Sequence, residues 1–197
     1  MNANATSEGA SCLFDEGVIS TRVAALGSKI SLDYAGKEVV LLAVMKGSLV
    51  FAADLIRHIT VPVHLETVRL RSYQRKRSTG RVEMVQYYDQ DQIPGKHVLI
   101  VEDIVDSGLT VHWLMEHLQR FGPASVKVCS LLVKPLEVRR LPVPVHYWGF
   151  QVPADSFVVG YGLDYDEKYR NKPFVATMSI LTKLSFAAVS LFDAIFI

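Results

Sequence analysis

The stretch from Val98 to Thr110 reads VLIVEDIVDSGLT, and it decides the fold class. Four apolar residues lead to two adjacent carboxylates, Glu102 and Asp103; two more apolar residues follow, and then a turn of small and polar residues at 106–110. A short continuous apolar run is typical of a strand buried on both faces of a parallel sheet. After the turn, apolar residues recur at helical spacing. The stretch therefore predicts a buried strand, a polar loop and a helix in succession.

The same succession occurs elsewhere along the chain. Residues 38–44 form an apolar run that ends at Met45-Lys46-Gly47-Ser48, after which residues 49–58 return to helical spacing. This alternation predicts an α/β fold with a mainly parallel central sheet flanked by helices. Ligands bind at the carboxyl ends of the strands in such sheets, so the loops there are the candidate site. Strands are expected at 38–44, 61–70, 82–86, 97–101, 126–133, 146–150 and 157–159, and helices at 18–34, 49–58 and 110–121.

The composition fits one domain. The chain has 197 residues, with 21 Lys+Arg and 20 Asp+Glu, so the formal net charge is +1 and does not favour a nucleic acid or an acidic membrane as partner. The two cysteines, Cys12 and Cys129, lie far apart and lack metal-ligand spacing, which favours a reducing, cytoplasmic setting. Residues 1–10 are small and polar and predict a loose N-terminus without a signal peptide.

The C-terminal end is unusually apolar. The mean hydropathy is +0.22, and the excess gathers in residues 180–197, where 13 of 18 residues are apolar. Lys183 and Asp193 interrupt this run, which argues against a membrane-spanning helix. An added helix over an apolar face, an oligomer contact and an altered chain end remain open interpretations, and membrane attachment is a further alternative. We expect one domain over residues 1–174 and an atypical apolar tail over residues 175–197.

The turn Asp106-Ser107-Gly108-Leu109-Thr110 has the chemistry of a phosphate site. Backbone N–H groups at a helix N-terminus, together with serine and threonine hydroxyls, bind a dianionic phosphate. Glu102 and Asp103, just before this turn, suit ribose hydroxyls or a diol chelated by Mg²⁺. The combination indicates a 5-phosphoribosyl group. The plainer alternative is an ordinary turn in which an acidic residue only caps the helix.

This loop resembles the binding motif for phosphoribosyl diphosphate (PRPP) of type I phosphoribosyltransferases. Further segments narrow the resemblance to the hypoxanthine-guanine phosphoribosyltransferase family, and they occur in the family's order between about Val18 and Phe174. The resemblance implies the type I fold, in which chain-terminal segments add a small hood to the sheet. The matching segments are Val44 to Ser48, Arg71-Ser72-Tyr73 with Ser78-Thr79-Gly80, Leu132 to Pro135, and Phe157 to Tyr165 with Tyr169-Arg170.

The resemblance also implies a reaction and the residues that carry it. A purine nitrogen displaces pyrophosphate from PRPP, and Asp106 accepts the proton of the purine N7. Mg²⁺ is the implied cofactor, with Glu102 and Asp103 at one ion beside the ribose diol and Asp164 helping to hold a second. In this family the peptide bond before the lysine, here Met45 to Lys46, can be cis. The residues implied to bind PRPP and its phosphates are Lys46, Gly47, Glu102, Asp103, Asp106, Ser107, Gly108, Leu109, Thr110 and Arg170.

Purine recognition falls, by the same resemblance, to Lys134, Phe157, Val158 and Asp164. A lysine at the end of an apolar strand is costly to desolvate, which by itself indicates a functional reason. The resemblance implies that Lys134 donates to the 6-oxygen of hypoxanthine or guanine, that Phe157 stacks on the purine and that the main chain of Val158 reads the base edge. The alternatives from the residues alone are a lysine at a strand edge and an aromatic core residue.

Residues 71–80 lack apolar spacing and predict a mobile loop, which resembles the family's lid with Ser72 and Tyr73 closing over PRPP. We expect a purine salvage enzyme that makes IMP or GMP from PRPP and a 6-oxopurine, assembled as a homodimer or homotetramer, without nucleic-acid or membrane partners. The alternative is a PRPP-sensing regulatory protein that binds nucleic acid through the basic residues of this region. These residues are Arg69, Arg71, Arg75, Lys76, Arg77 and Arg81.

Overall fold

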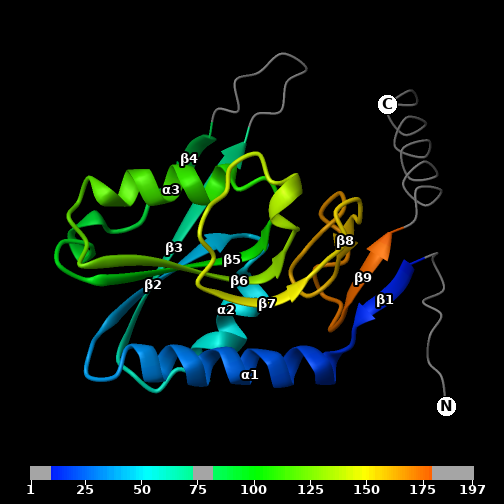
Figure 1. Ribbon diagram of the computed structural model, residues 1–197, viewed down its shortest axis with the longest axis horizontal. Coiled ribbons are helices and arrows are strands. Elements are labelled where there is room, and N and C mark those ends of the chain that lie inside the picture. Colours follow the sequence, from blue (N-terminus) through cyan, green and yellow to red (C-terminus); the bar gives the residue numbers. More distant parts are fainter. Residues whose placement is uncertain (1–9, 73–81, 179–197) are drawn as a thin grey trace, which may run out of the picture. The chain divides into compact units, whose positions relative to one another are not determined.

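The computed structural model describes residues 10–72 and 82–178 (Figure 1). The chain divides into two compact units. The larger unit comprises residues 20–154, and the smaller unit is formed by both ends of the chain, residues 1–19 and 155–197.

The larger unit is built on a six-stranded sheet in the order β4-β3-β2-β5-β6-β7. All neighbouring strands pair in parallel except β4, which runs antiparallel to β3 at one edge. The expected α/β fold with a mainly parallel central sheet is therefore confirmed. The strands are β2 (Val39–Met45), β3 (Val63–Ser72), β4 (Val82–Gln86), β5 (His97–Val105), β6 (Ser125–Val133) and β7 (Tyr147–Gln151).

Helices cover both faces of this sheet (Figure 1). One face lies under α3 (Leu109–Gln119), and the other lies under α2 (Leu49–Ile56) and the part of α1 (Glu16–Asp33) that belongs to this unit. β2 has the apolar sequence VVLLAVM. It is buried over nearly its whole length because both faces of the sheet are covered. Short 3₁₀ turns, η1 (Gln90–Gln92) and η2 (Leu136–Val138), lie in two of the connections.

β5 is longer than the sequence pattern predicts. The expected strand ends at Val101, with Glu102 and Asp103 in a loop, but β5 continues to Val105. Glu102 is paired with Ser130 of β6, and Ile104 with Leu132. The apolar residues that follow the acidic pair extend the strand, and the main chain of the pair stays in the sheet. Glu102 is therefore a buried strand residue, which corrects its expected place in a loop.

The smaller unit contains a three-stranded antiparallel sheet in the order β1-β9-β8. Its strands are β1 (Ala10–Phe14), β8 (Val158–Val159) and β9 (Val175–Met178). They come from the two ends of the chain, which confirms the expected hood of chain-terminal segments. The sequence pattern predicts neither β1 nor β9, because both are short and pair with segments far away in the sequence.

Two expectations concern the ends of the chain. β9 begins at residue 175, where the apolar tail was expected to begin, and the run at 180–197 lies outside the described residues. In the described parts of the chain, 10–72 and 82–178, no helix has the length and apolar character needed to cross a membrane.

Candidate active site

The carboxyl ends of β2 and β5 frame the candidate site. These strands are neighbours in the sheet, but the chain passes from β2 to β3 on one side, whereas β5 is followed by β6 on the other. The connections after β2 and β5 therefore diverge, and this is where open α/β sheets form a ligand crevice. Lys46 and Gly47 follow β2, and the loop 106–110 follows β5, so two of the predicted phosphate-binding groups share one edge of the sheet.

Gly108 shapes the loop after β5. Its φ is 81°, in the left-handed region, and it occupies the N-cap position of α3. A Cβ at this position would collide with the main-chain oxygen of Leu141, whose N–H donates to the main-chain oxygen of Ser107 at 3.1 Å. The loop is thereby fixed against the connection after β6. Its peptide groups lie at the N-terminus of α3, where a helix favours a bound phosphate.

Asp106 is exposed at the start of this loop. The N-cap position of α3 belongs to Gly108, and the N–H of Leu109, the first residue of α3, donates to Oγ of Ser107 at 3.4 Å. The alternative in which Asp106 only caps α3 is therefore wrong. An exposed carboxylate next to a phosphate loop can instead contact a bound substrate.

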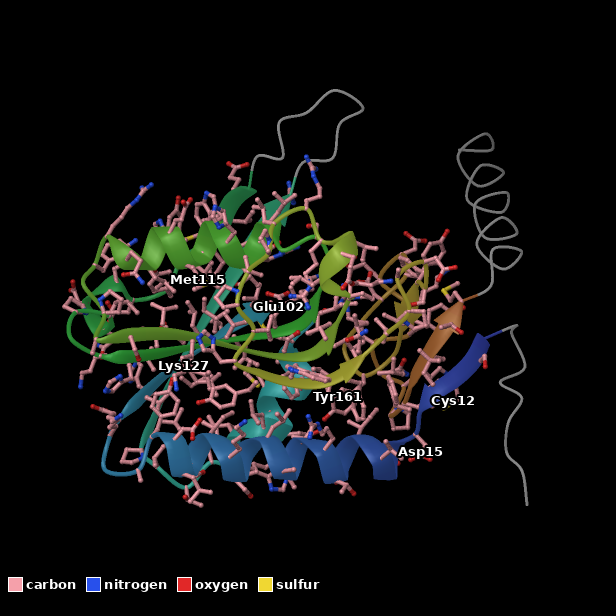
Figure 2. The ribbon with its side chains drawn as sticks, in the orientation of Figure 1. Cys12, Asp15, Glu102, Met115, Lys127 and Tyr161 are labelled. Atoms are coloured by element: carbon pink, nitrogen blue, oxygen red, sulfur yellow. The ribbon has the colours of Figure 1, made fainter. Side chains whose placement is uncertain are left out.

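Glu102 is the buried member of the acidic pair. Its side chain lies in the interior of the larger unit (Figure 2) and is 8% exposed. Among the described residues, its Oε2 atom has no hydrogen-bond partner. Burial raises the pKa of Glu102 well above its ordinary value, and the negative charge of Asp103 raises it further. A nearby cation would therefore favour ionisation of both carboxyl groups.

Asp103 faces the connection after β2. Its Oδ1 accepts a hydrogen bond from the main-chain N–H of Ile104 at 2.8 Å, and a Cβ on Gly47 would collide with its Oδ2. The carboxylate thus packs against Gly47, beside the Met45–Lys46 peptide bond, which is cis, as the resemblance allows.

The acidic pair fits Mg²⁺. Both residues offer carboxylate oxygens, one of them buried and unsatisfied, and Mg²⁺ is usually held by one or two carboxylates completed by substrate phosphates. Within the described residues, no three His, Cys, Asp or Glu side chains form a metal-binding group. Asp164, the residue expected to help hold a second Mg²⁺, belongs to the smaller unit.

Lys134 directly follows β6 and is buried, with 4% of its surface exposed. Its main-chain N–H donates to Val105 at the end of β5 (3.0 Å). Its ammonium donates to the main-chain oxygens of Pro153 (2.8 Å) and Ala154 (2.9 Å), which offset the cost of burying the charge. The alternative of an ordinary snorkelling lysine at a strand edge is therefore wrong.

In the smaller unit, the structure brings Asp164 and Arg170 into direct contact. Nη2 of Arg170 lies 2.7 Å from Oδ1 of Asp164, and Nη1 donates to the main-chain oxygen of Gly162 at 2.7 Å. Oδ2 of Asp164 accepts a hydrogen bond from the N–H of Glu167. The Nε atom of Arg170 is buried without a partner in the described part of the chain. Two residues predicted for metal and pyrophosphate binding thus form one ion pair.

Phe157 and Val158 lie at the edge of the small sheet. The ring of Phe157 contacts Tyr165 edge to face, with ring centroids 5.7 Å apart. The N–H of Met178 donates to the main-chain oxygen of Phe157, so this pair is the hydrogen-bonded one, and the next pair, Val158 with Thr177, is not. The main-chain groups of Val158 therefore point to the open side of β8.

The segment expected to form the lid lies largely outside the described residues. Ser72 is the last residue of β3, whereas Tyr73 and the basic residues Arg75, Lys76, Arg77 and Arg81 lie in the undescribed segment. The larger unit brings together the groups after β2, β5 and β6. The remaining predicted residues, Phe157, Val158, Asp164 and Arg170, belong to the smaller unit.

Sequence reasoning missed the role of the connection between β6 and β7. The prolines at 135, 142 and 144 indicate only a connection, yet Leu141 in this segment contacts the loop of Ser107 and Gly108. In the sequence LPVPV at 141–145, apolar residues alternate with prolines. This pattern indicates that the segment packs on another surface, because its apolar side chains need to be buried.

A mainly parallel sheet with a glycine turn at a helix N-terminus and an acidic pair beside its switch point is the arrangement expected for a phosphoribosyl-transfer enzyme, and the family model described as phosphoribosyl transferase domain matches residues 12–166. The hypoxanthine-guanine phosphoribosyltransferase of Mycobacterium tuberculosis is 44% identical over 167 residues, which cover 81% of each chain. This chain therefore belongs to the hypoxanthine-guanine phosphoribosyltransferase family.

Two solved structures agree with this assignment. The hypoxanthine-guanine phosphoribosyltransferase of Bacillus anthracis has a TM-score of 0.79 at 45% identity and covers 85% of this chain and 95% of that one. A mutant of the hypoxanthine phosphoribosyltransferase of Trypanosoma cruzi, complexed with the product IMP, has a TM-score of 0.83 at 36% identity, with coverage of 92% and 97%.

Proposed function

We propose that this protein transfers the 5-phosphoribosyl group of PRPP to hypoxanthine or guanine, with release of pyrophosphate, in purine salvage. The observation that carries the proposal is the position of the loop 106–110 and the pair Glu102–Asp103 beside the switch point between β2 and β5. The loop suits the 5′-phosphate of PRPP, and the carboxylates suit the ribose diol.

The pyrophosphate of PRPP is assigned to the segment of Lys46 and Gly47, next to Asp103. Glu102 and Asp103 would hold one Mg²⁺, and Asp164 of the smaller unit would help to hold a second; when bound, the metal supplies positive charge to the diphosphate. Arg170 is the second cation proposed for the pyrophosphate, and its buried Nε is an unused donor among the described residues.

Asp106 is the proposed general base. As a purine nitrogen forms its bond to the anomeric carbon, the bond from that carbon to pyrophosphate breaks, and the N7 proton passes to the Asp106 carboxylate. The role requires an exposed carboxylate next to the phosphate loop, and Asp106 has this position.

Lys134 and Val158 are the proposed readers of the base. An ammonium can only donate hydrogen bonds, so Lys134 favours a 6-oxopurine over adenine, whose 6-amino group is itself a donor. The outward-pointing main-chain groups of Val158 are suited to the purine edge, and Phe157 to its ring face.

A spectrophotometric assay with PRPP, Mg²⁺ and each purine tests the proposal. We expect IMP from hypoxanthine and GMP from guanine, little product from adenine, and no turnover when EDTA removes divalent metal. If no 6-oxopurine yields a nucleotide, the proposed activity is wrong. Salt-sensitive nucleic-acid binding without turnover would instead favour the regulatory alternative.

A homodimer or homotetramer in the cytoplasm is the proposed state of the protein. Leu65 on β3 is 51% exposed, and Val85 and Tyr87, on and after β4, are 43% and 70% exposed, so this edge of the sheet offers apolar surface to a second copy. Light scattering on the purified chain would show a monomer mass if the proposal is wrong.

A further inference from the structure

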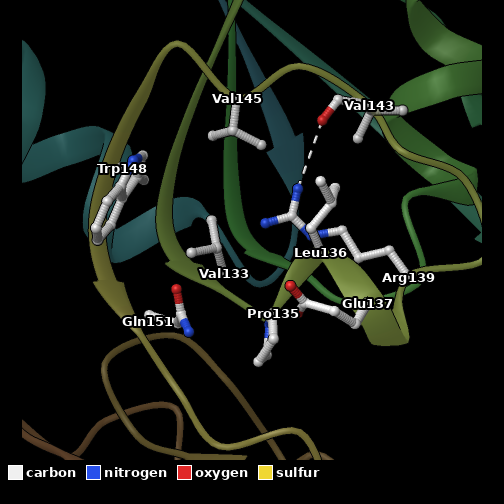
Figure 3. A pocket seen from close by; sticks show the side chains of 9 residues that line it. All are labelled: Val133, Pro135, Leu136, Glu137, Arg139, Val143, Val145, Trp148 and Gln151. Atoms are coloured by element: carbon white, nitrogen blue, oxygen red, sulfur yellow. Dashed lines mark hydrogen bonds between the residues drawn. The ribbon is translucent and has the colours of Figure 1, made fainter.

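Arg139 holds the main chain of Lys134. Its Nε and Nη2 atoms both donate to the main-chain oxygen of Lys134, at 3.0 Å and 2.8 Å. Its Nη1 atom reaches the main-chain oxygen of Val143 at 3.5 Å, the bond drawn in Figure 3. One guanidinium therefore connects the residue after β6 with the far end of the connection that follows it.

The remaining polar groups of Lys134 are fixed by other parts of the larger unit. Its N–H is bonded to Val105, and its ammonium is bonded to Pro153 and Ala154. The main-chain oxygen is the group that Arg139 binds. Since a lysine side chain has four rotatable bonds, the ammonium keeps a fixed place only when both its main chain and its end are held.

The surroundings of Arg139 are only partly polar. Arg139 lines a cavity of about 360 Å³ with Glu137 and Gln151 and with apolar residues such as Val133, Val143 and Trp148 (Figure 3). Burial lowers the pKa of Arg139 from its ordinary value, although Glu137 partly opposes this effect. An apolar residue would fill the position at lower desolvation cost, so an arginine here indicates a need for its donors.

We propose that Arg139 is a positioning residue for the recognition of 6-oxopurines, which acts by fixing the main chain of Lys134. The proposal rests on the proposed role of Lys134 as the donor to the purine 6-oxygen. The planar guanidinium of Arg139 donates two N–H groups to a single oxygen, and a lysine cannot reproduce this geometry.

The proposal predicts an effect on the purine and little effect on PRPP. The same connection is attached to the phosphate loop through the N–H of Leu141 and the oxygen of Ser107, and this bond does not involve Arg139. Loss of the guanidinium should therefore disturb Lys134 more than the loop that receives the 5′-phosphate.

The first experiment compares Arg139→Met, Arg139→Lys and, as a matched control, Arg140→Met, which changes the neighbouring exposed arginine. We expect Arg139→Met to raise KM for hypoxanthine and guanine about tenfold, which corresponds to about 1.4 kcal/mol, and KM for PRPP less than about twofold. Arg139→Lys should lie between Arg139→Met and wild type, and Arg140→Met should match wild type. Equal increases in both KM values would overturn the proposal. If Arg139→Met does not fold, Arg139→Lys at an unchanged Tm provides the same comparison.

The second experiment combines Arg139→Met with Lys134→Met. If Arg139 acts through Lys134, the double variant should have the same purine KM as Lys134→Met alone, because the positioned group is already absent. Additive effects would contradict the proposal while leaving the role of Lys134 intact. If Lys134→Met itself leaves purine KM unchanged, the proposed function of Lys134 is the part that fails. The two failures are therefore distinguishable.

Discussion

At the end of β5, the binding loop is made by neighbours in sequence: Gly108 turns the chain, and the first peptide groups of α3 follow at once. At the end of β6, Lys134 is held by Arg139 and by Pro153 and Ala154, which lie up to 20 residues further along the chain. The first region is shaped by backbone geometry, and the second is held by side-chain contacts. We expect substitutions at the end of β5 to change catalysis and PRPP binding, and those at the end of β6 to change purine choice.

The largest effect is expected from Asp106→Asn at the end of β5. The amide keeps the shape of the side chain but cannot accept the N7 proton, so kcat should fall about 10²- to 10³-fold. KM for PRPP should stay near the wild-type value, because the peptide groups of the phosphate loop are unchanged. Steady-state kinetics over a range of PRPP concentrations measures both. A variant that keeps its kcat would show that Asp106 is not the base.

Gly108→Ala should have the next largest effect. At a φ of 81°, a side chain is strained, and its Cβ would collide with the main-chain oxygen of Leu141. The loop must shift, and we expect kcat/KM for PRPP to fall about 30- to 100-fold and Tm to fall by several degrees. Gly122→Ala is a matched control, because Gly122 also has a positive φ, of 64°, but no atom within 4 Å of an added Cβ. The control should lose stability only. Similar kinetics for the two variants would remove the special role of Gly108.

The two regions also differ in how well the sequence predicts their structure. The segment 98–110 carries its own signals: an apolar run, an acidic pair and a glycine-containing turn before a helix. The apolar run predicts a strand that ends at Val101, before the acidic pair. Glu102 stays in the strand and is buried, and its main chain remains paired with β6.

The hydrogen bonds that hold Lys134 could not be predicted in the same way. The cost of burying a lysine indicates that it has partners, but the carbonyl oxygens of Pro153 and Ala154 and the guanidinium of Arg139 are brought there only by the folded chain. The strands β1 and β9 were missed for the same physical reason. Cys12 pairs with Ala176, and local sequence patterns carry no information about partners so distant.

Gly47→Ala tests whether a collision with a side chain lowers activity less than a collision with the main chain. The added Cβ would meet the Asp103 carboxylate, which can rotate away, whereas at Gly108 it meets a main-chain oxygen. We therefore expect a smaller effect than that of Gly108→Ala: KM for PRPP should rise about tenfold. The requirement for Mg²⁺ should also rise, because Asp103 is displaced. Titration of activity with Mg²⁺ measures this shift. An effect larger than that of Gly108→Ala would reverse the expected order.

The smallest effect concerns His146, at the edge of the sheet next to β7. Its Nδ1 accepts a hydrogen bond from the main-chain N–H of Val128 at 3.1 Å, which requires a neutral ring. Burial lowers the pKa of His146 from its ordinary value of 6.5, and the positive charge of Lys127 lowers it further. The unfolded chain therefore binds the proton more readily, and this contribution to stability is present above pH 6.5 and is lost as the pH falls below it.

His146→Asn separates this titration from the hydrogen bond, because an amide oxygen can accept from Val128 but does not titrate between pH 5 and 8. We expect the free energy of unfolding, measured with urea at pH 8 and pH 5.5, to fall less in His146→Asn than in the wild type. His112→Asn, which removes a histidine from α3, serves as the control. Equal losses in the wild type and in His146→Asn would show that the ring of His146 does not titrate differently in the folded and unfolded chain. The edge of β7 would then be insensitive to acid at this position.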